Sequence, residues 1–163
     1  MAKKYVNPTK VVTGECRFSY ANLWEAKAMD ENSKPKYSVS LIIPKSDTKT
    51  IEKVKAAIQA AYDEGKSKLS NGKSVPSLNS IKTPLRDGDI DRPDDEAYAN
   101  SYFINANSII APGIVDADRQ PILEHSEIYS GIYGRASITF YAFNTKTSRG
   151  IACGLQNVQK LRD

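Results

Sequence analysis

The sequence has no run of apolar residues near the length needed to cross a bilayer. Its first residues, Met1-Ala-Lys-Lys, lead into polar residues and not into the apolar segment of a signal peptide. We therefore expect a soluble, unexported protein with no membrane partner. Cysteine is also scarce, because Cys16 and Cys153 are the only two and lack the close spacing of a zinc knuckle or a redox pair. We expect both thiols to be reduced and buried in strands.

The motifs that carry catalysis are missing as well. His125 is the sole histidine, and no known motif places a serine or cysteine nucleophile beside it. The chain has neither a glycine loop that cradles phosphates nor a dinucleotide fingerprint. We therefore expect a protein that is not an enzyme and needs no cofactor.

The residues that are present fit one domain spanning 1–163. A chain of 163 residues with 40% hydrophobic residues can form a stable core without disulfide bonds or a bound metal. The net charge is only +4, but the run 86–96 holds six carboxylates against two arginines, a local charge of −4. The remaining residues therefore carry +8, which supports a basic surface that attracts phosphates. Scattered lysines alone would be an ordinary solvated surface.

Alternating polarity predicts five strands, at about 11–20, 36–43, 101–110, 132–143 and 149–155. In the first strand one face holds Val12, Cys16, Phe18 and Tyr20, and the wet face holds Thr13, Glu15, Arg17 and Ser19. In the second, we expect Tyr37, Val39, Leu41 and Ile43 to face inward and Lys36, Ser38 and Ser40 outward. The first two strands would form a hairpin through the connection 21–35. For the strand 101–110, the pattern does not decide which face points toward the core.

The spacing changes after Pro44 to three- and four-residue intervals, which predicts one amphipathic helix with Ile51, Val54, Ile58, Ala61 and Tyr62 on its apolar side. Ser46 or Asp47 can cap its first amides, and Gly65 or Asn71-Gly72 can end it. Prolines, glycines and acids then dominate 71–100, which predicts a long surface excursion. Five antiparallel strands with one helix between the second and third predict a mainly β, closed Greek-key barrel of the OB type.

The strand 132–143 has the most informative pattern. Gly134, Ala136, Ile138, Phe140 and Ala142 can fill a core, while the opposite face holds Tyr133, Arg135, Ser137, Thr139, Tyr141 and Phe143. Unpaired nucleic-acid bases could stack on such a face of rings and a guanidinium. Tyrosines also pack well on pleated surfaces, so each ring by itself fits a packing role equally well.

These segments carry a resemblance. The stretches 129–144 (YSGIYGRASITFYAFN) and 150–161 (GIACGLQNVQKL), with 14–24 (GECRFSYANLW) and 37–46 (YSVSLIIPKS), resemble a family of phage single-stranded DNA-binding proteins. The resemblance covers most of the chain apart from the acidic excursion. It implies an OB barrel related to the T7-type phage protein, and sequence-tolerant binding of single-stranded DNA in phage replication, recombination or repair in the host cytoplasm. Such proteins usually end in an acidic tail that recruits partners, whereas this sequence ends at Lys160-Leu-Arg-Asp163.

By the same resemblance, two sets of residues would contact DNA. Base stacking is expected from Tyr133, Tyr141, Phe143 and Trp24, although Trp24 suits a core position equally well. Phosphate contacts are expected from Arg17, Lys34, Lys36, Arg135, Lys146 and Arg149. Arg17 could instead pair with Glu15 on its own strand, and Lys34 could simply solvate a loop.

Two other functions compete with this interpretation. The acidic run 87–96 could hold metal ions for a nuclease or related phosphodiesterase, but its glycine follows the first aspartate and does not fit the familiar calcium loop. A solvated loop that repels stray DNA or contacts a partner fits that run better. The barrel could also be a protein-interaction module. Replication or recombination proteins and a second copy of the chain, as a homodimer, remain open as partners.

Overall fold

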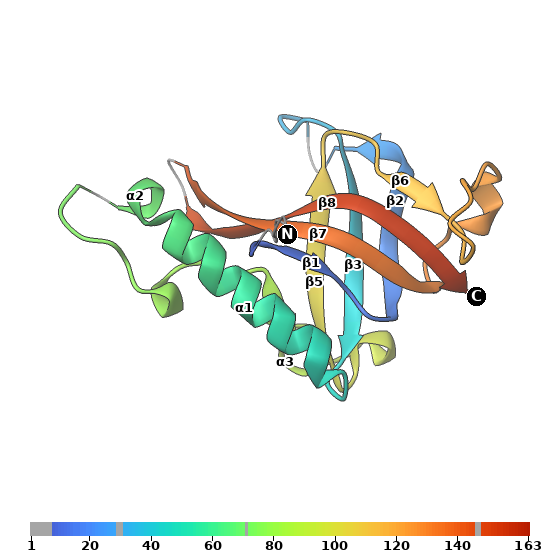
Figure 1. Ribbon diagram of the computed structural model, residues 1–163, viewed down its shortest axis with the longest axis horizontal. Helices are drawn as coiled ribbons and strands as arrows, with labels where there is room; N and C mark the ends of the chain where they lie inside the picture. The colour runs from blue at the N-terminus through green and yellow to red at the C-terminus, as the bar shows by residue number, and fades with distance from the viewer. Residues whose placement is uncertain (1–7, 29–30, 71, 146–147) are drawn as a thin grey trace, which may run out of the picture.

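The computed structural model describes residues 8–28, 31–70, 72–145 and 148–163. These residues form a mainly β structure with one eight-stranded sheet (Figure 1). The strands are β1 (Lys10–Val12), β2 (Cys16–Lys27), β3 (Lys36–Pro44), β4 (Leu85–Asp87), β5 (Ser101–Ser108), β6 (Gly113–Val115), β7 (Tyr133–Asn144) and β8 (Arg149–Arg162). The helices are α1 (Thr48–Glu64), α2 (Lys66–Leu69) and α3 (Gly88–Asp91), with single 3₁₀ turns η1 (Leu78–Ser80), η2 (Glu96–Tyr98) and η3 (His125–Glu127).

The pairing of the strands is mostly antiparallel. β3 pairs with β2 on one side and β5 on the other, β7 pairs with β8 along its whole length, and β2 also meets β7. The expectation of a purely antiparallel set is wrong, because β5 meets β8 in a parallel pairing at Asn107 and Gly154. The short strand β6 also runs parallel to β8. β7 runs opposite to β5, and β8 runs opposite to β7, so β5 and β8 run in the same direction.

The strand β7 has the predicted two faces. Its small and apolar residues Gly134, Ala136, Ile138, Phe140 and Ala142 are all buried, while the other face is half-buried or exposed. Gly134 is required by close packing, because a Cβ there would lie 2.2 Å from the backbone oxygen of Gln159 on β8. The inner residues join the main hydrophobic core with Phe18, Leu41 and residues of α1. In Figure 1, β7 and β8 form a long curved pair that crosses β3 and β5, with α1 alongside.

The amphipathic helix is confirmed as α1. Asp47 caps it, since its Oδ1 accepts a hydrogen bond from the Thr50 backbone N–H at 3.2 Å, and Gly65 ends it. Its buried side is Thr50, Ile51, Val54, Ala57, Ile58 and Ala61. Tyr62 is only half-buried and donates its hydroxyl hydrogen to the Pro76 carbonyl at 2.7 Å. The expectation of a single helix is wrong, because α2 and α3 add short helical turns that carry little periodicity.

The first predicted strand is divided in two. The chain leaves β7 after β1 and turns at Gly14, whose N–H donates to the Thr50 hydroxyl at 3.1 Å on the first turn of α1. This detour shifts the alternation by one residue, so Val11 and Thr13 are buried and Val12 is 54% exposed. Placing Val12 with the inward residues was therefore wrong. Strand β2 then continues to Lys27, well past the predicted end.

Two further residues face the other way from the prediction. Tyr20 lies at an irregularity in the pairing of β2 with β3 and is 58% exposed, although it was grouped with Cys16 and Phe18. Ser40 is buried and not outward in solvent, because the Tyr98 hydroxyl lies 3.0 Å from its Oγ. The prediction that both cysteines are unpaired and buried is confirmed for Cys16 and Cys153. Burial raises the pKa of Cys16 to about 12.

The segment 72–100 lies partly on the sheet and not wholly at the surface. Tyr98 is fully buried and packs with Ile42 and Phe103 in a second, smaller core, with its ring edge-on to Phe103 at a centroid distance of 5.0 Å. β4 pairs with β5 and so adds a strand from this segment to the sheet. The composition of the segment hid this packing, because a single tyrosine among acids carries no periodicity. We call residues 72–100 the excursion.

Candidate nucleic-acid interface

A hollow made of cavities that share lining residues lies over β3 and β5 and extends onto β7 and β8. It consists of three adjoining cavities of about 410, 390 and 330 Å³, all of them lined by Asn107. One part is bounded by Lys27, Lys34 and Lys36, the next by Tyr20 and Arg92, and the third by Lys36 and Tyr141. We call this continuous hollow the groove.

The floor of the groove is built from small polar side chains. The register of β3 and β5 sets Ser38 opposite Asn107 and Ser40 opposite Asn105. Side chains opposite each other in an antiparallel pair share a face, so these short residues keep the floor low while β3 and β5 stay fully paired. Such a floor offers hydrogen-bonding groups without bulk that would block an extended chain.

Three lysines form the cationic side of the groove. Lys27 ends β2, Lys36 begins β3, and Lys34 belongs to the loop that joins these strands. Lys27 and Lys36 are directly opposite in the pairing, which brings them together although nine positions separate them. All three are exposed, so their ammonium groups can reach a phosphodiester backbone. The sequence identified Lys34 and Lys36 but missed Lys27, which it placed inside a loop.

Tyr141 supplies an aromatic ring beside these lysines. The residue is 45% exposed and lies next to Gly154 of β8, where an added Cβ would be 3.6 Å from the Tyr141 ring atom Cε1. The absence of a side chain at position 154 leaves space above the strand for the ring. Of the residues predicted to stack, Tyr141 is the one that lines the groove.

Tyr133 and Arg17 lie together, but at the other end of β7. They are directly paired between β2 and β7, and the Arg17 guanidinium carbon is 5.9 Å from the Tyr133 ring centroid. Arg162, which the sequence analysis missed, lies closer at 3.9 Å and also bonds the Glu15 carboxylate at 2.9 Å. That carboxylate raises the pKa of Arg162 above its usual value. The ring is thus flanked by guanidinium groups, and Glu15 pairs with Arg162 and not with Arg17.

Trp24 makes contacts that favour a structural role. Its ring stacks on the ring of His125 at a centroid distance of 4.3 Å and an angle of 9°. Its indole N–H donates to the His125 carbonyl at 3.0 Å, and the residue also packs against the main core. One face of the ring is therefore covered by η3, and Trp24 holds that turn against β2.

The remaining predicted residues lie apart from the groove. Arg149 donates a hydrogen bond to the Leu69 carbonyl at 3.0 Å, which binds the start of β8 to the end of α2. Phe143 is half-buried near the same end of β7, and Arg135 is exposed opposite Gln159. Lys146 lies outside the residues that the structure describes. The structure thus brings Lys34, Lys36 and Tyr141 together in the groove and places the other predicted residues elsewhere.

The acidic run is largely engaged in holding the excursion in place. The Lys45 ammonium lies 3.0 Å from Asp87 and 2.8 Å from Asp89, which lowers the pKa of Asp89 below its usual value. Asp89 also accepts a hydrogen bond from the Asn100 backbone N–H at 3.0 Å. In the described part of the chain, no three histidine, cysteine or carboxylate side chains are grouped so that they could hold a metal ion.

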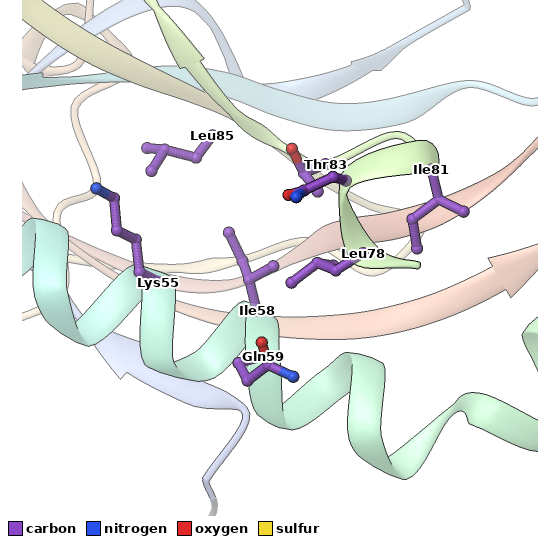
Figure 2. Close-up of a pocket in the computed structure, with 8 residues that line it drawn as sticks. Lys55, Ile58, Gln59, Leu78, Ile81, Thr83 and Leu85 are labelled. Atoms are coloured by element: carbon purple, nitrogen blue, oxygen red, sulfur yellow. The ribbon is translucent and has the colours of Figure 1, made fainter. Parts of the chain in front are cut away.

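A further hollow of about 440 Å³ separates α1 from the excursion (Figure 2). Lys55, Ile58 and Gln59 come from the helix, and Leu78, Ile81, Thr83 and Leu85 face them (Figure 2). Its lining holds one cation and no aromatic ring, so it lacks the stacking surface and charge that the groove has. Among the described helices, none is both long and apolar enough to span a membrane.

Solved structures share this fold. The single-stranded DNA-binding protein of bacteriophage Enc34 in complex with ssDNA superposes with a TM-score of 0.79, at 24% identity, covering 99% of this chain and 94% of that one. The single-stranded DNA-binding protein gp2.5 of bacteriophage T7 gives a TM-score of 0.66 at 16% identity, over 99% of this chain and 93% of that one. The fold is therefore that of phage single-stranded DNA-binding proteins.

The sequence itself identifies the family. A family model described as the Enterobacter phage Enc34 ssDNA-binding protein matches residues 9–163. The putative protein p50 of Acyrthosiphon pisum secondary endosymbiont phage 1 is 29% identical over 160 residues, covering 94% of this chain and 84% of that protein. The chain belongs to the family of the phage Enc34 ssDNA-binding protein, as the resemblance implied.

Proposed function

We propose that this protein binds single-stranded DNA along the groove, with little preference for sequence, during replication, recombination or repair of phage DNA in the host cell. The observation that carries this proposal is the groove itself. It joins three lysines, a polar floor and exposed rings in one continuous surface over β3 and β5. Membership of the Enc34 family supports the same ligand.

The chemistry of the groove explains the tolerance for sequence. Lys27, Lys34 and Lys36 would pair with phosphates, which are the same at every nucleotide. Tyr141 would stack on a base, and every base has a π-face. Asn105 and Asn107 add hydrogen bonds to bases or sugars from the floor. No chemical step and no cofactor is part of this function.

The strand pairings support an OB barrel as the scaffold. β2 pairs with β3, β3 with β5, β5 with β8, β8 with β7, and β7 again with β2. We infer that this circuit is a closed five-stranded barrel, with α1 inserted between its second and third strands. We further infer that the whole chain is one such domain, and the groove lies where OB barrels bind oligonucleotides, across their second and third strands.

The predicted residues outside the groove are assigned more weakly. A DNA strand would contact Tyr133, Arg17 and Arg162 only if it extended beyond the groove to the Tyr133 end of β7. Arg135 is exposed on the same strand and would act there as a phosphate contact. Phe143 and Arg149 lie where β7 ends and β8 begins, and there Arg149 already donates a hydrogen bond to the Leu69 carbonyl of α2. We expect these six residues to contribute less to binding than the groove residues.

The experiment is a titration of a fluorescently labelled oligothymidine strand, followed by anisotropy, beside a duplex of the same length. We expect clear preference for the single strand, because bases in a duplex are already stacked and cannot lie on Tyr141. Tyr141→Ala should weaken single-strand binding by about 5- to 150-fold, the loss expected for one stacked base. Tyr129→Ala is the matched control, since Tyr129 is equally exposed (45%) but does not line the groove.

Equal affinity for single and double strands would contradict the proposed ligand. If the single strand is preferred but Tyr141→Ala binds like Tyr129→Ala, the ligand is right and its placement over Tyr141 is wrong. The thermal midpoint of each variant is measured as well, because each residue is 45% exposed and Tyr129 also donates a hydrogen bond to Asp163, so a loss of binding must be separated from a loss of stability.

A further inference from the structure

Tyr20 holds an unusual backbone conformation at the edge of the groove. Its φ is +48°, in the left-handed region, which bulky residues rarely adopt because the Cβ crowds the carbonyl oxygen. The surrounding strand imposes this conformation, since the pairing of β2 with β3 is irregular between Ser19 and Asn22. The Asn22 side-chain amide donates to the Tyr20 carbonyl at 3.2 Å and to the Ser38 hydroxyl at 3.3 Å. As a result the ring points outward and the residue is 58% exposed. Strained residues of this kind are concentrated at functional sites.

Arg92 of the excursion lies against this ring. Its guanidinium carbon is 5.3 Å from the ring centroids of Tyr20 and Phe103 and 5.1 Å from that of Tyr98. Three rings therefore hold the guanidinium group in place, and Tyr98 and Phe103 are themselves buried. Tyr20 and Arg92 both line the groove, beside Asn105 and Asn107. A cation that is held this rigidly loses little conformational entropy when it binds an anion.

The hydrogen-bonding capacity of Arg92 is incompletely used. Its Nε is buried and has no hydrogen-bond partner among the described residues. No ion pair to Arg92 is found in the described part of the chain, although it sits in the acidic run. Because the Nε is buried, a ligand would meet the terminal Nη groups of Arg92, for which no hydrogen bond is found among the described residues. A phosphate, with oxygens that match the guanidinium fork, is the anion that the proposed ligand supplies.

The nearby carboxylates are directed to other partners. Asp87 and Asp89 pair with Lys45, and Asp91 lies 3.5 Å from Arg86. Gly88 packs tightly under this arrangement, since a Cβ there would lie 2.3 Å from the Tyr98 carbonyl oxygen. The acidic run thus fixes the excursion to the sheet and leaves the Arg92 guanidinium for the groove.

We propose that Tyr20 and Arg92 form a nucleotide subsite at the excursion end of the groove, in which the Tyr20 ring stacks on a base and Arg92 binds an adjacent phosphate. This inference rests on the proposed function and adds to it a contact from the excursion. The acidic excursion then helps to bind DNA through Arg92, despite its net negative charge.

The test compares single-strand affinity, its salt dependence and the thermal midpoint for three variants. Tyr20→Gly should weaken binding of oligothymidine by about 5- to 150-fold without changing the salt dependence. Its thermal midpoint should stay equal or rise, because glycine adopts a positive φ without strain. Arg92→Gln should weaken binding and lower the slope of log K against log salt by about 0.7, as expected for one lost phosphate contact.

Arg86→Gln is the matched control for Arg92→Gln. Arg86 lies in the same excursion, is exposed, does not line the groove and carries the same charge. If Arg92→Gln matches Arg86→Gln in affinity and slope, and Tyr20→Gly binds normally, the subsite is refuted while the proposed function stands. If the unmodified protein does not prefer single strands, the proposed function fails and the subsite fails with it. If Arg92→Gln folds poorly, the single-strand affinity of Tyr20→Gly still tests the subsite, because glycine relieves the backbone strain at position 20 and this variant should fold.

Discussion

The lysines of the groove allow a quantitative prediction. Replacing Lys34 and Lys36 together with glutamine removes two cations that line the groove, while the neutral side chains keep much of the original bulk. For single strands each phosphate contact contributes about 0.7 to the slope of log K against log salt, so the double variant should lose about 1.4. Between about 50 and about 200 mM salt, the affinity of the unmodified protein should then fall about sevenfold further than that of the variant.

The assay is an anisotropy titration with labelled oligothymidine at four or more salt concentrations. The control is the double replacement Lys49→Gln and Lys53→Gln, which removes the same charge from the exposed side of α1. We expect this control to keep the original slope, since its lysines lie outside the groove. Equal slopes for the two double variants would refute the reasoning, because binding would then depend on overall charge and not on the groove.

Three further predictions concern the scaffold. Tyr98→Phe removes the hydroxyl partner of buried Ser40 and should lower the free energy of unfolding by about 1–3 kcal/mol in urea denaturation, a loss that Ser40→Ala should partly reverse in the double variant. Gly134→Ala should lower the free energy of unfolding by about 1–3 kcal/mol or more, since the added Cβ would lie 2.2 Å from a backbone oxygen of β8. Gly154→Ala should lower it by less than about 1 kcal/mol, because the nearest atoms to its Cβ lie at 3.6 Å. A lower thermal midpoint for Gly154→Ala than for Gly134→Ala would contradict this. Burial raises the pKa of Cys16 to about 12, so a thiol reagent near neutral pH should react at the unfolding rate only, and rapid labelling of the native protein would show that the thiol is accessible.

The sequence was most informative where periodicity is strong and local. The alternation over 132–143 predicted which side chains of β7 are buried, and the three- and four-residue spacing after Pro44 predicted α1 with its Asp47 cap. These patterns are reliable because one face of each element packs against the main core along its whole length. Burial at one position then implies burial at the next position of the same face.

The prediction of the site was only partly successful, for a geometric reason. Tyr133 and Tyr141 share a strand face, so they were assigned to one binding surface. Eight residues of a strand span about 26 Å, and the two rings therefore serve different ends of β7. The pairing of β2 with β3 instead brings Lys27 to Lys36, a contact that no local pattern in the loop between them reveals.

By itself, the sequence determined the family, the mainly β composition, the amphipathic helix and the two faces of β7, because local side-chain periodicity and long matching strings carry that information. Only the tertiary structure decided which exposed side chains share a groove. Irregular pairing turns Tyr20 outward, and the excursion folds back over β3 and β5 so that Arg92 meets that ring. The first depends on how Ser19 and Asn22 pair with the neighbouring strand β3. The second depends on a contact between residues 72 positions apart, which the composition of an acidic, proline-containing segment cannot express.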